Sequence, residues 1–100
     1  GEEWLDVNPY KGNKVAVEIG KRAYDMNCAR CHGIDGMTGG FSPDLRLLPN
    51  DPEGDAFFIY PTREGVFRNG NTYMPAYEGL ISQEAMWAIR TWLETKHVEE

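Results

Sequence analysis

The segment Cys28-Ala29-Arg30-Cys31-His32 contains both cysteines of the 100-residue chain and one of its two histidines. Two thiols and an imidazole this close together are typical of a covalent cofactor attachment, a thiol redox pair or part of a metal centre. A further reading is a plain disulfide between the two cysteines. The residues around the segment distinguish these readings.

The segment matches C-x-x-C-H, the signature for attachment of haem c. The spacing has a physical cause, because two thiols separated by two residues in a turn reach the two vinyl groups on one porphyrin edge and form thioethers. The adjacent imidazole then projects under the ring onto the iron. The sequence therefore predicts one haem c, attached through Cys28 and Cys31, with His32 as a ligand of the iron.

The other readings fit the sequence less well. A thioredoxin-type redox pair requires alternating strands and helices, and the chain has no such pattern. Structural zinc needs four ligands, whereas the segment supplies three and His97, near the far terminus, is a poor fourth. A disulfide between Cys28 and Cys31 would close too small a loop to stabilise much.

The second axial ligand of haem c in electron carriers is commonly methionine. Met74 is the best candidate here, because it lies in a predicted loop over residues 71–80 and Pro75 stiffens the backbone after it. Ligation by His32 and Met74 would fill both axial positions of the iron. That arrangement favours electron transfer over catalysis.

Three other methionines and one histidine are weaker candidates for this ligand. Met26 and Met37 flank the attachment segment and are expected on the wrong side of the ring. Met86 lies in an amphipathic helix, where core packing explains it. His97 lies in a Glu-rich tail that is expected to fray.

Periodicity and capping residues predict three helices. The first covers residues 14–27, the second covers residues 62–69 and ends at Gly70, and the third begins after Ser82 and ends near Lys96. The apolar spacing predicts the buried residues of the first and last helices. These are Val15, Ile19, Ala23 and Met26 on the first, and Ala85, Ile89, Trp92 and Leu93 on the last.

The rest of the chain is expected to be irregular. Residues 1–13 are predicted to form an irregular arm. Residues 33–56 are rich in glycine and proline and are predicted to form a long loop, of the kind that is functional or wraps around another group. No credible strand is found, so the predicted fold class is all-α, with three to five helices around the haem. The apolar residues expected to bury the haem are Phe41, Leu45, Leu47, Leu48, Phe57, Phe58, Ile59, Val66, Phe67 and Leu80.

The formal net charge of −6 argues against binding to nucleic acid or to anionic lipid. No apolar run approaches the length of a membrane span. A basic patch on a partner protein is the natural complement of this surface. Asp51, Glu53 and Asp55 form an acidic cluster that would either steer such a partner or simply be a solvated loop.

The chain resembles a class I cytochrome c along residues 14–96. That family has an N-terminal helix leading into C-x-x-C-H, a loop, a short helix, a methionine loop and a C-terminal helix. Its two terminal helices cross at a contact between a glycine and aromatic residues. The resemblance places Gly20 and Tyr24 on one side of this contact. It places Trp92 and Leu93 on the other.

The same resemblance implies further haem contacts. In the family, a Pro-x-Leu segment packs beside the ligand histidine, and its proline carbonyl accepts the hydrogen bond from the imidazole. Pro43-Asp44-Leu45-Arg46 matches this pattern, so Pro43 would orient His32. Arg46 would contact a haem propionate, or it is an ordinary solvated charge. Tyr73, from the methionine loop, is also an expected haem contact.

Within this class, the chain is most similar to the soluble cytochromes that accept electrons from quinoprotein alcohol dehydrogenases. Related phrases also occur in cytochrome domains fused to oxidases and dehydrogenases, and the chain lacks the long extensions of several acceptors. The similarity lies in three sequence segments: Phe57-Phe58-Ile59-Tyr60-Pro61, Phe67-Arg68-Asn69-Gly70 and Tyr73-Met74-Pro75-Ala76-Tyr77.

The sequence thus predicts an electron carrier and not an enzyme, with an arm (1–13), a cytochrome c domain (14–97) and an acidic tail (98–100). It would shuttle electrons from a periplasmic dehydrogenase, such as a PQQ-dependent alcohol dehydrogenase, to a cytochrome or terminal oxidase. A monomer in the periplasm, with its signal peptide removed, is expected. Two alternatives stay open: a haem domain excised from a larger oxidase or dehydrogenase, and a ligand-binding haem sensor.

Overall fold

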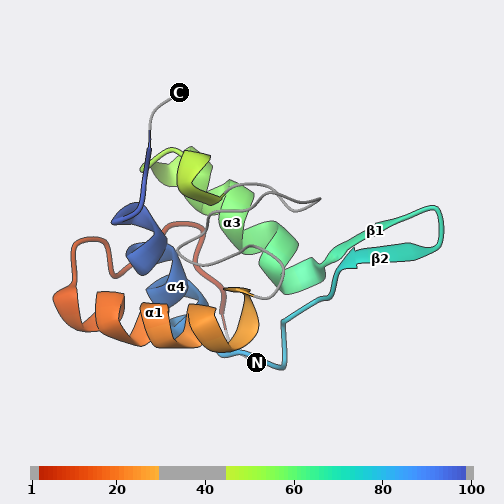
Figure 1. Cartoon of the computed structure of the whole chain (residues 1–100), viewed down its shortest axis with the longest axis horizontal. Helices are drawn as coiled ribbons and strands as arrows, with labels where there is room; N and C mark the ends of the chain where they lie inside the picture. The colour runs from red at the N-terminus through yellow and green to blue at the C-terminus, as the bar shows by residue number, and fades with distance from the viewer. Residues whose placement is uncertain (1–2, 30–44, 99–100) are drawn as a thin grey trace.

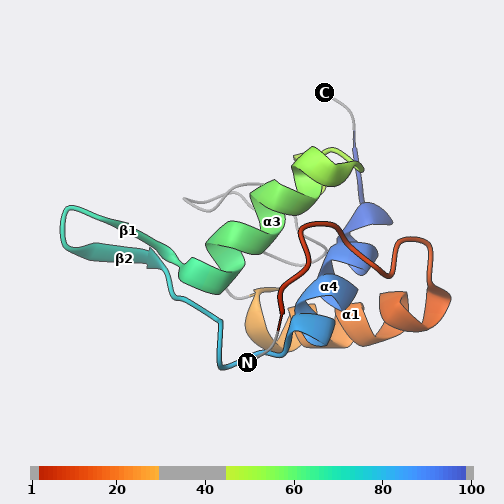
Figure 2. The same cartoon turned by 180° about the vertical axis from the view of Figure 1, so that it is seen from behind.

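The computed structural model describes residues 3–29 and 45–98, which form mostly helical structure (Figure 1). Helix α4 lies between α1 and α3, and a hairpin extends from the end of α3 (Figure 2). In chain order the elements are α1 (Lys14–Asn27), the 3₁₀-helix η2 (Leu45–Leu47), α3 (Pro52–Glu64), β1 (Val66–Arg68), β2 (Asn71–Met74) and α4 (Gln83–Glu94).

Both terminal helices begin at capping residues. The side chain of Asn13 accepts a hydrogen bond from the N–H of Ala16, which satisfies one of the four unpaired donors at the start of α1. Ser82 does the same for Ala85 in α4, as predicted, and Glu84 lies in the first turn of that helix.

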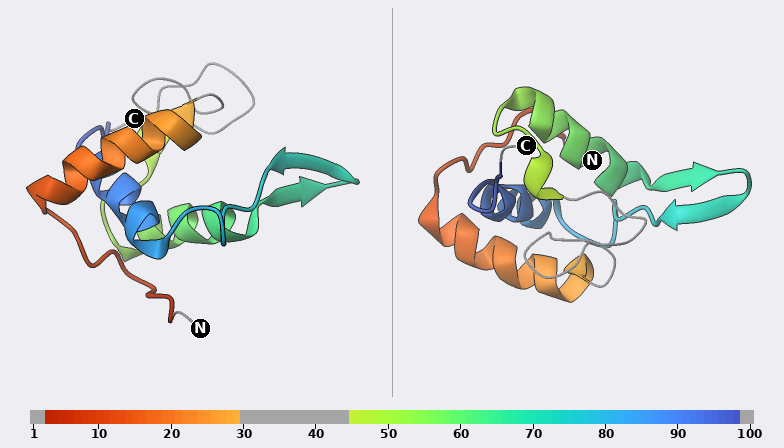
Figure 3. Two further views of the ribbon diagram at one scale, coloured as in Figure 1. Left: turned by 90° about the horizontal axis from the view of Figure 1, so that it is seen from below. Right: turned by 45° about the horizontal axis from the view of Figure 1, so that its top comes forward.

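Helix α1 crosses α4 (Figure 3), and the two backbones approach closely at Gly20. A Cβ atom placed on Gly20 would lie 1.9 Å from the carbonyl oxygen of Ala88, so only glycine permits this approach. One turn further along α1, the ring of Tyr24 packs on Trp92 with centroids 4.7 Å apart. The glycine–aromatic crossing implied by the cytochrome resemblance is therefore present, with Gly20 against Ala88 and Ile89.

The buried face of α1 differs from the prediction. Val15, Ile19 and Met26 are at least half exposed, and only Ala23 of the predicted stripe is partly buried. The buried residues, spaced by four, are Ala16, Gly20 and Tyr24. The predicted buried face was wrong because it was chosen from the spacing of the larger apolar side chains. Where α1 approaches the α4 backbone most closely, the small residue Gly20 faces the contact instead.

Helix α4 forms the centre of the core. The predicted core role of Met86 is confirmed, since this side chain is fully buried, and Ile89, Trp92 and Leu93 are buried as expected. Ala85 is only partly buried. Trp87 packs on Phe58 of α3, with ring centroids 6.5 Å apart, and its indole N–H donates to Gln83. Helix α4 therefore joins α1 and α3 in one core.

The middle of the chain corrects two expectations. Helix α3 begins at Pro52, inside the predicted loop, and ends at Gly65 (φ 78°), where the predicted helix over 62–69 should continue. The next residues form the antiparallel hairpin β1–β2, although no strand was expected. Asn69 and Gly70 both have positive φ (52° and 79°), the type I′ turn favoured by Asn-Gly. Gly70 closes a hairpin, not a helix.

The crossing predicts a strong penalty for one added methyl group. Gly20→Ala should lower the free energy of unfolding by about 1–3 kcal/mol, the usual range for overpacking, even though alanine favours helix more than glycine. Denaturant unfolding followed by tryptophan fluorescence measures this. Glu18→Ala, on the exposed side of the same helix, is the control and should change stability by less than about 0.5 kcal/mol. Equal stability of the two variants would contradict the crossing geometry.

Candidate functional site

Cys28 caps the C-terminal end of α1. Its backbone N–H donates to the carbonyl oxygen of Tyr24 at 2.7 Å, and its side chain, in a residue only 8% exposed, belongs to the core cluster. Because α1 is fixed on α4 at Gly20, the packing of this helix helps to position the residue that carries the thiol. Of the other predicted haem residues, Cys31, His32 and Pro43 lie outside the described residues.

Met74 is the last residue of β2 rather than a loop residue, which corrects the prediction for residues 71–74. It is partly buried and pairs with Val66. A Cβ atom on Gly65 would lie 2.7 Å from the Met74 carbonyl oxygen and 2.8 Å from the Ala76 nitrogen. The backbone from Met74 to Ala76 therefore packs directly against Gly65, the C-cap of α3.

Tyr77 connects this chain to both neighbouring helices. Its backbone N–H donates to the carbonyl oxygen of Thr62 in α3 at 2.9 Å. Its hydroxyl donates to the carbonyl oxygen of Asn27, the last residue of α1, at 3.0 Å. Met74 is three residues from Tyr77, at most about 10 Å of extended chain. The candidate ligand segment and the candidate attachment residue Cys28 are thus held in one neighbourhood.

No role for Tyr77 is predicted from the sequence, although this residue belongs to the segment 73–77 that resembles other cytochromes. Its side chain is partly buried against the core cluster, and its polar tip reaches the end of α1. The signal that could have indicated a role for this residue is a tyrosine that closely follows a methionine-proline pair in a predicted loop. Periodicity could not use it, because the partner is a backbone carbonyl 50 residues away.

The predicted haem-burying residues that the structure describes separate into three groups by exposure. Phe58 and Ile59 are buried in the protein core and are ordinary packing residues. Leu45, Leu48 and Val66 are partly buried, and Phe41 lies outside the described residues. The predicted residues that leave large apolar surfaces exposed are Leu47, Phe57, Phe67 and Leu80, at 42%, 58%, 58% and 76%.

These observations fit a haem. Cys28 lies at the end of the firmly packed helix α1. Met74 lies on a segment that is hydrogen-bonded to the same helix end through Tyr77. Phe67 in the hairpin and Leu80 after Tyr77 expose apolar surface on the elements that flank Met74. Large exposed apolar groups of this kind are typical of binding sites. When bound, haem c would cover part of that surface.

Arg46 and Tyr73 retain their predicted roles as hypotheses. Arg46 lies in η2 and is partly buried, and its carbonyl oxygen accepts a hydrogen bond from the N–H of Val98 at 3.0 Å. This bond fixes the backbone at Arg46 against the end of the chain. Tyr73 directly precedes Met74 in β2.

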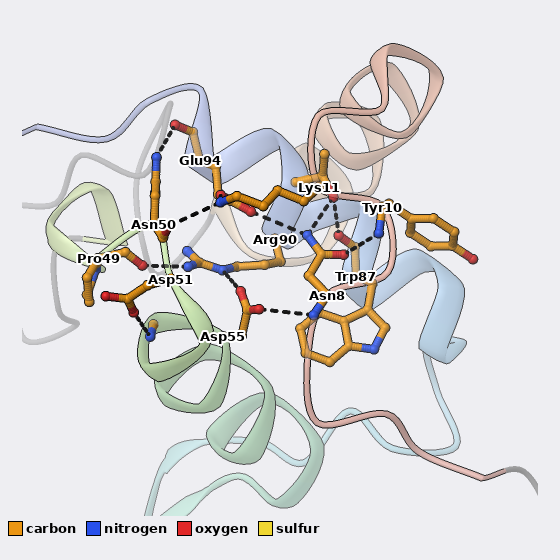
Figure 4. A network of polar contacts seen from close by, with 12 residues as sticks. Asn8, Tyr10, Lys11, Pro49, Asn50, Asp51, Asp55, Trp87, Arg90 and Glu94 are labelled. Atoms are coloured by element: carbon orange, nitrogen blue, oxygen red, sulfur yellow. Dashed lines mark hydrogen bonds and ion pairs between the residues drawn. The ribbon is translucent and has the colours of Figure 1, made fainter.

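The predicted acidic cluster lies at the start of α3, and only Asp51 and Glu53 of its three residues are exposed. The side chain of Asp51 caps α3 by accepting from the N–H of Gly54, and Glu53 is exposed in the first turn. Asp55 is buried and pairs with the buried Arg90 of α4 at 2.7 Å (Figure 4). Removing one partner of such a buried pair usually costs several kcal/mol, so Asp55 is a structural residue.

The same network fastens the N-terminal arm. The backbone N–H of Asn8 donates to Asp55 at 3.0 Å (Figure 4). The side-chain amide of Asn8 donates to the hydroxyl of Thr91 at 2.8 Å. Arg90 also donates to the carbonyl oxygen of Pro49 at 2.6 Å. These bonds satisfy buried polar groups on three segments at once. The arm, α3 and α4 are therefore locked together on the side of α4 away from α1.

Two further properties concern the described part of the chain. Within residues 3–29 and 45–98, no group of three or more His, Cys, Asp or Glu side chains could hold a metal ion. None of the helices in those same stretches has the length and apolarity needed to cross a membrane.

Comparison with known sequences matches residues 15–93 to the family described as cytochrome C oxidase, cbb3-type, subunit III. The chain belongs to the cytochrome c family. It carries covalently bound haem c with its iron, and it is an electron carrier rather than an enzyme.

Two relatives extend the comparison for this cytochrome. It is 50% identical to cytochrome c550 of Pseudomonas aeruginosa over 104 aligned positions, which cover the whole chain and 72% of that relative. It is 33% identical to the quinohemoprotein alcohol dehydrogenase ADH-IIG of Pseudomonas putida over 79 positions, 79% of this chain but 10% of the dehydrogenase. No solved structure matches significantly.

Proposed function

We propose that this cytochrome carries single electrons on a haem attached through Cys28 and Cys31, with His32 and Met74 as the axial ligands. The observation that supports this most is the hydrogen bond from Tyr77 to Asn27. It joins the chain after Met74 to the residue before Cys28. The two candidate contact points of the haem are therefore tied to each other through the protein.

The chain's own residues would determine how the electron moves. Haem c supplies the one-electron redox couple when bound. The imidazole of His32 and the thioether of Met74 would occupy both axial positions, which leaves no place for a substrate and favours outer-sphere transfer. A thioether stabilises the reduced iron, so a moderately positive potential is expected. The packing of Cys28 in the core and of the Met74 backbone on Gly65 would limit movement between the two oxidation states.

The remaining predicted haem residues have supporting roles in this proposal. The carbonyl oxygen of Pro43 would accept the hydrogen bond from His32 and fix the orientation of the imidazole. Arg46 would pair with a propionate and Tyr73 would pack on the haem. The domain division into an arm (1–13), a cytochrome domain (14–97) and a tail (98–100) is kept, with the arm fastened through Asn8.

We propose a periplasmic location and a PQQ-dependent alcohol dehydrogenase as the electron donor, with a cytochrome or terminal oxidase as acceptor. The similarity to one domain of a quinohemoprotein alcohol dehydrogenase supports this donor class. The same similarity also favours the alternative of a cytochrome domain within a longer oxidase or dehydrogenase. The length of the complete open reading frame distinguishes a free carrier from such a domain.

Replacing Met74 tests the axial ligation. Met74→Ala should abolish the far-red sulfur-to-iron absorption band of the ferric protein and allow cyanide to bind readily, because an axial position opens. Met26→Ala is the matched control, since Met26 is 77% exposed on α1 and should leave the spectrum unchanged. An unchanged spectrum for Met74→Ala would show that another group ligates the iron. A wild-type protein without the band, open to cyanide, would favour the sensor alternative.

Stopped-flow reduction by purified quinoprotein alcohol dehydrogenases tests the donor. Reduction should slow as ionic strength rises, because the net charge of −6 favours a basic partner surface. Glu64→Gln, beside Gly65 and the Met74 backbone, should lower the low-salt rate about twofold, the effect of one charge about 8 Å from a partner charge in water.

Glu53→Gln is the matched control for this measurement. It removes the same charge at the opposite end of α3, about 15–20 Å away along the helix, and should change the rate little. Equal effects of the two substitutions would contradict steering toward the Met74 side. No reduction by any of these enzymes would remove the support for this donor class.

A further inference from the structure

Tyr77 occupies an unusual position in the hydrogen bonding of the molecule. The last carbonyl groups of a helix have no partner within the helix. At the end of α1, the carbonyl oxygen of Asn27 accepts from the Tyr77 hydroxyl at 3.0 Å. A side chain distant in sequence thus completes the helix end that carries Cys28.

The other contacts of this segment are made to α3. Tyr77 and Glu78 donate backbone hydrogen bonds to the carbonyl oxygens of Thr62 and Arg63, at 2.9 and 3.2 Å. The guanidinium of Arg63 in turn pairs with Glu78 at 2.7 Å. These contacts hold the segment to one side of the molecule, whereas the Tyr77 hydroxyl extends to the helix on the other side.

Met74 and Tyr77 are coupled through a short stretch of restricted backbone. Pro75 fixes one φ angle between them, and the Ala76 nitrogen lies against Gly65. The carbonyl oxygen of Tyr77 also accepts hydrogen bonds from Leu80 and Ile81, at 2.9 and 3.0 Å, so a turn holds the residues that follow. A displacement of Met74 toward solvent would therefore tend to move Tyr77, and the Asn27 bond opposes that displacement.

We propose that Tyr77 is a positioning residue for the axial ligand: its hydroxyl latches the Met74 segment to the end of α1 and stabilises the closed, ligated arrangement. This inference rests on the proposed ligation by Met74. In ferric cytochromes of this ligation, cyanide competes with the thioether. The latch should therefore oppose cyanide binding.

The test measures the cyanide affinity of the ferric, haem-loaded protein. Tyr77→Phe removes the hydroxyl and keeps the ring that packs on the core, so the protein should fold. Its cyanide association constant should rise about threefold, the factor expected for one ordinary, partly solvated hydrogen bond. The far-red band should also disappear at a lower denaturant concentration than in the wild type.

Tyr60→Phe is the matched control. It also removes a hydroxyl that makes one hydrogen bond, to Asp6 at 3.2 Å, but Tyr60 lies within α3 and contacts the arm instead of α1. It should leave cyanide affinity unchanged. Unchanged affinity in Tyr77→Phe, or an equal rise in both variants, would overturn the latch.

A third variant distinguishes failure of the latch from failure of the proposed ligation by Met74. Met74→Ala should bind cyanide more tightly than the wild type and more tightly than Tyr77→Phe. If Met74→Ala equals the wild type, Met74 is not the ligand, and both the ligation and the latch are rejected. If Met74→Ala binds more tightly while Tyr77→Phe equals the wild type, ligation by Met74 stands and the latch alone is rejected.

Discussion

The close contact between Gly20 and Ala88 is the constraint on which the rest of the molecule depends. It brings the backbones of α1 and α4 together, places Tyr24 on Trp92, and sets the end of α1 with Cys28 in the core. The opposite side of α4 is then free to pack on α3, through Trp87 and Phe58 and through the buried Arg90–Asp55 pair. A small chain obtains from this arrangement one continuous core centred on a single helix.

The functional site follows from the same core. One candidate contact point, Cys28, lies at the end of a helix fixed by the crossing. The other, Met74, ends β2, the second strand of the hairpin that follows α3. Tyr77 connects the two, because its backbone is bonded to α3 and its hydroxyl to α1. Hydrogen bonds within the protein therefore restrict the relative positions of the two segments that are proposed to contact the haem c. Such restriction suits an electron carrier, in which small changes of ligand geometry on oxidation favour fast transfer.

The sequence predicted the local chemistry better than the contacts. C-x-x-C-H and the Ser82 cap are signals contained within a few residues, and family membership and the cap confirm what they indicate about haem c and about the start of α4. Apolar periodicity chose the wrong face of α1, because it gives no weight to a glycine, whereas the cytochrome resemblance placed Gly20 and Tyr24 correctly at the crossing. The hairpin was missed because Asn69-Gly70 can end a helix or turn a hairpin. Asp55 and Tyr77 could not be assigned, since their partners, Arg90 and Asn27, are 35 and 50 residues away.

Peptide mass mapping of the protein matured in a host that attaches haem c tests the central claim most directly. The account predicts a single haem mass on the proteolytic peptide that contains Cys28 and Cys31, lost only by chemistry that cleaves thioethers. Recovery of that peptide with two unmodified thiols, from protein that has passed through such a host, would contradict it.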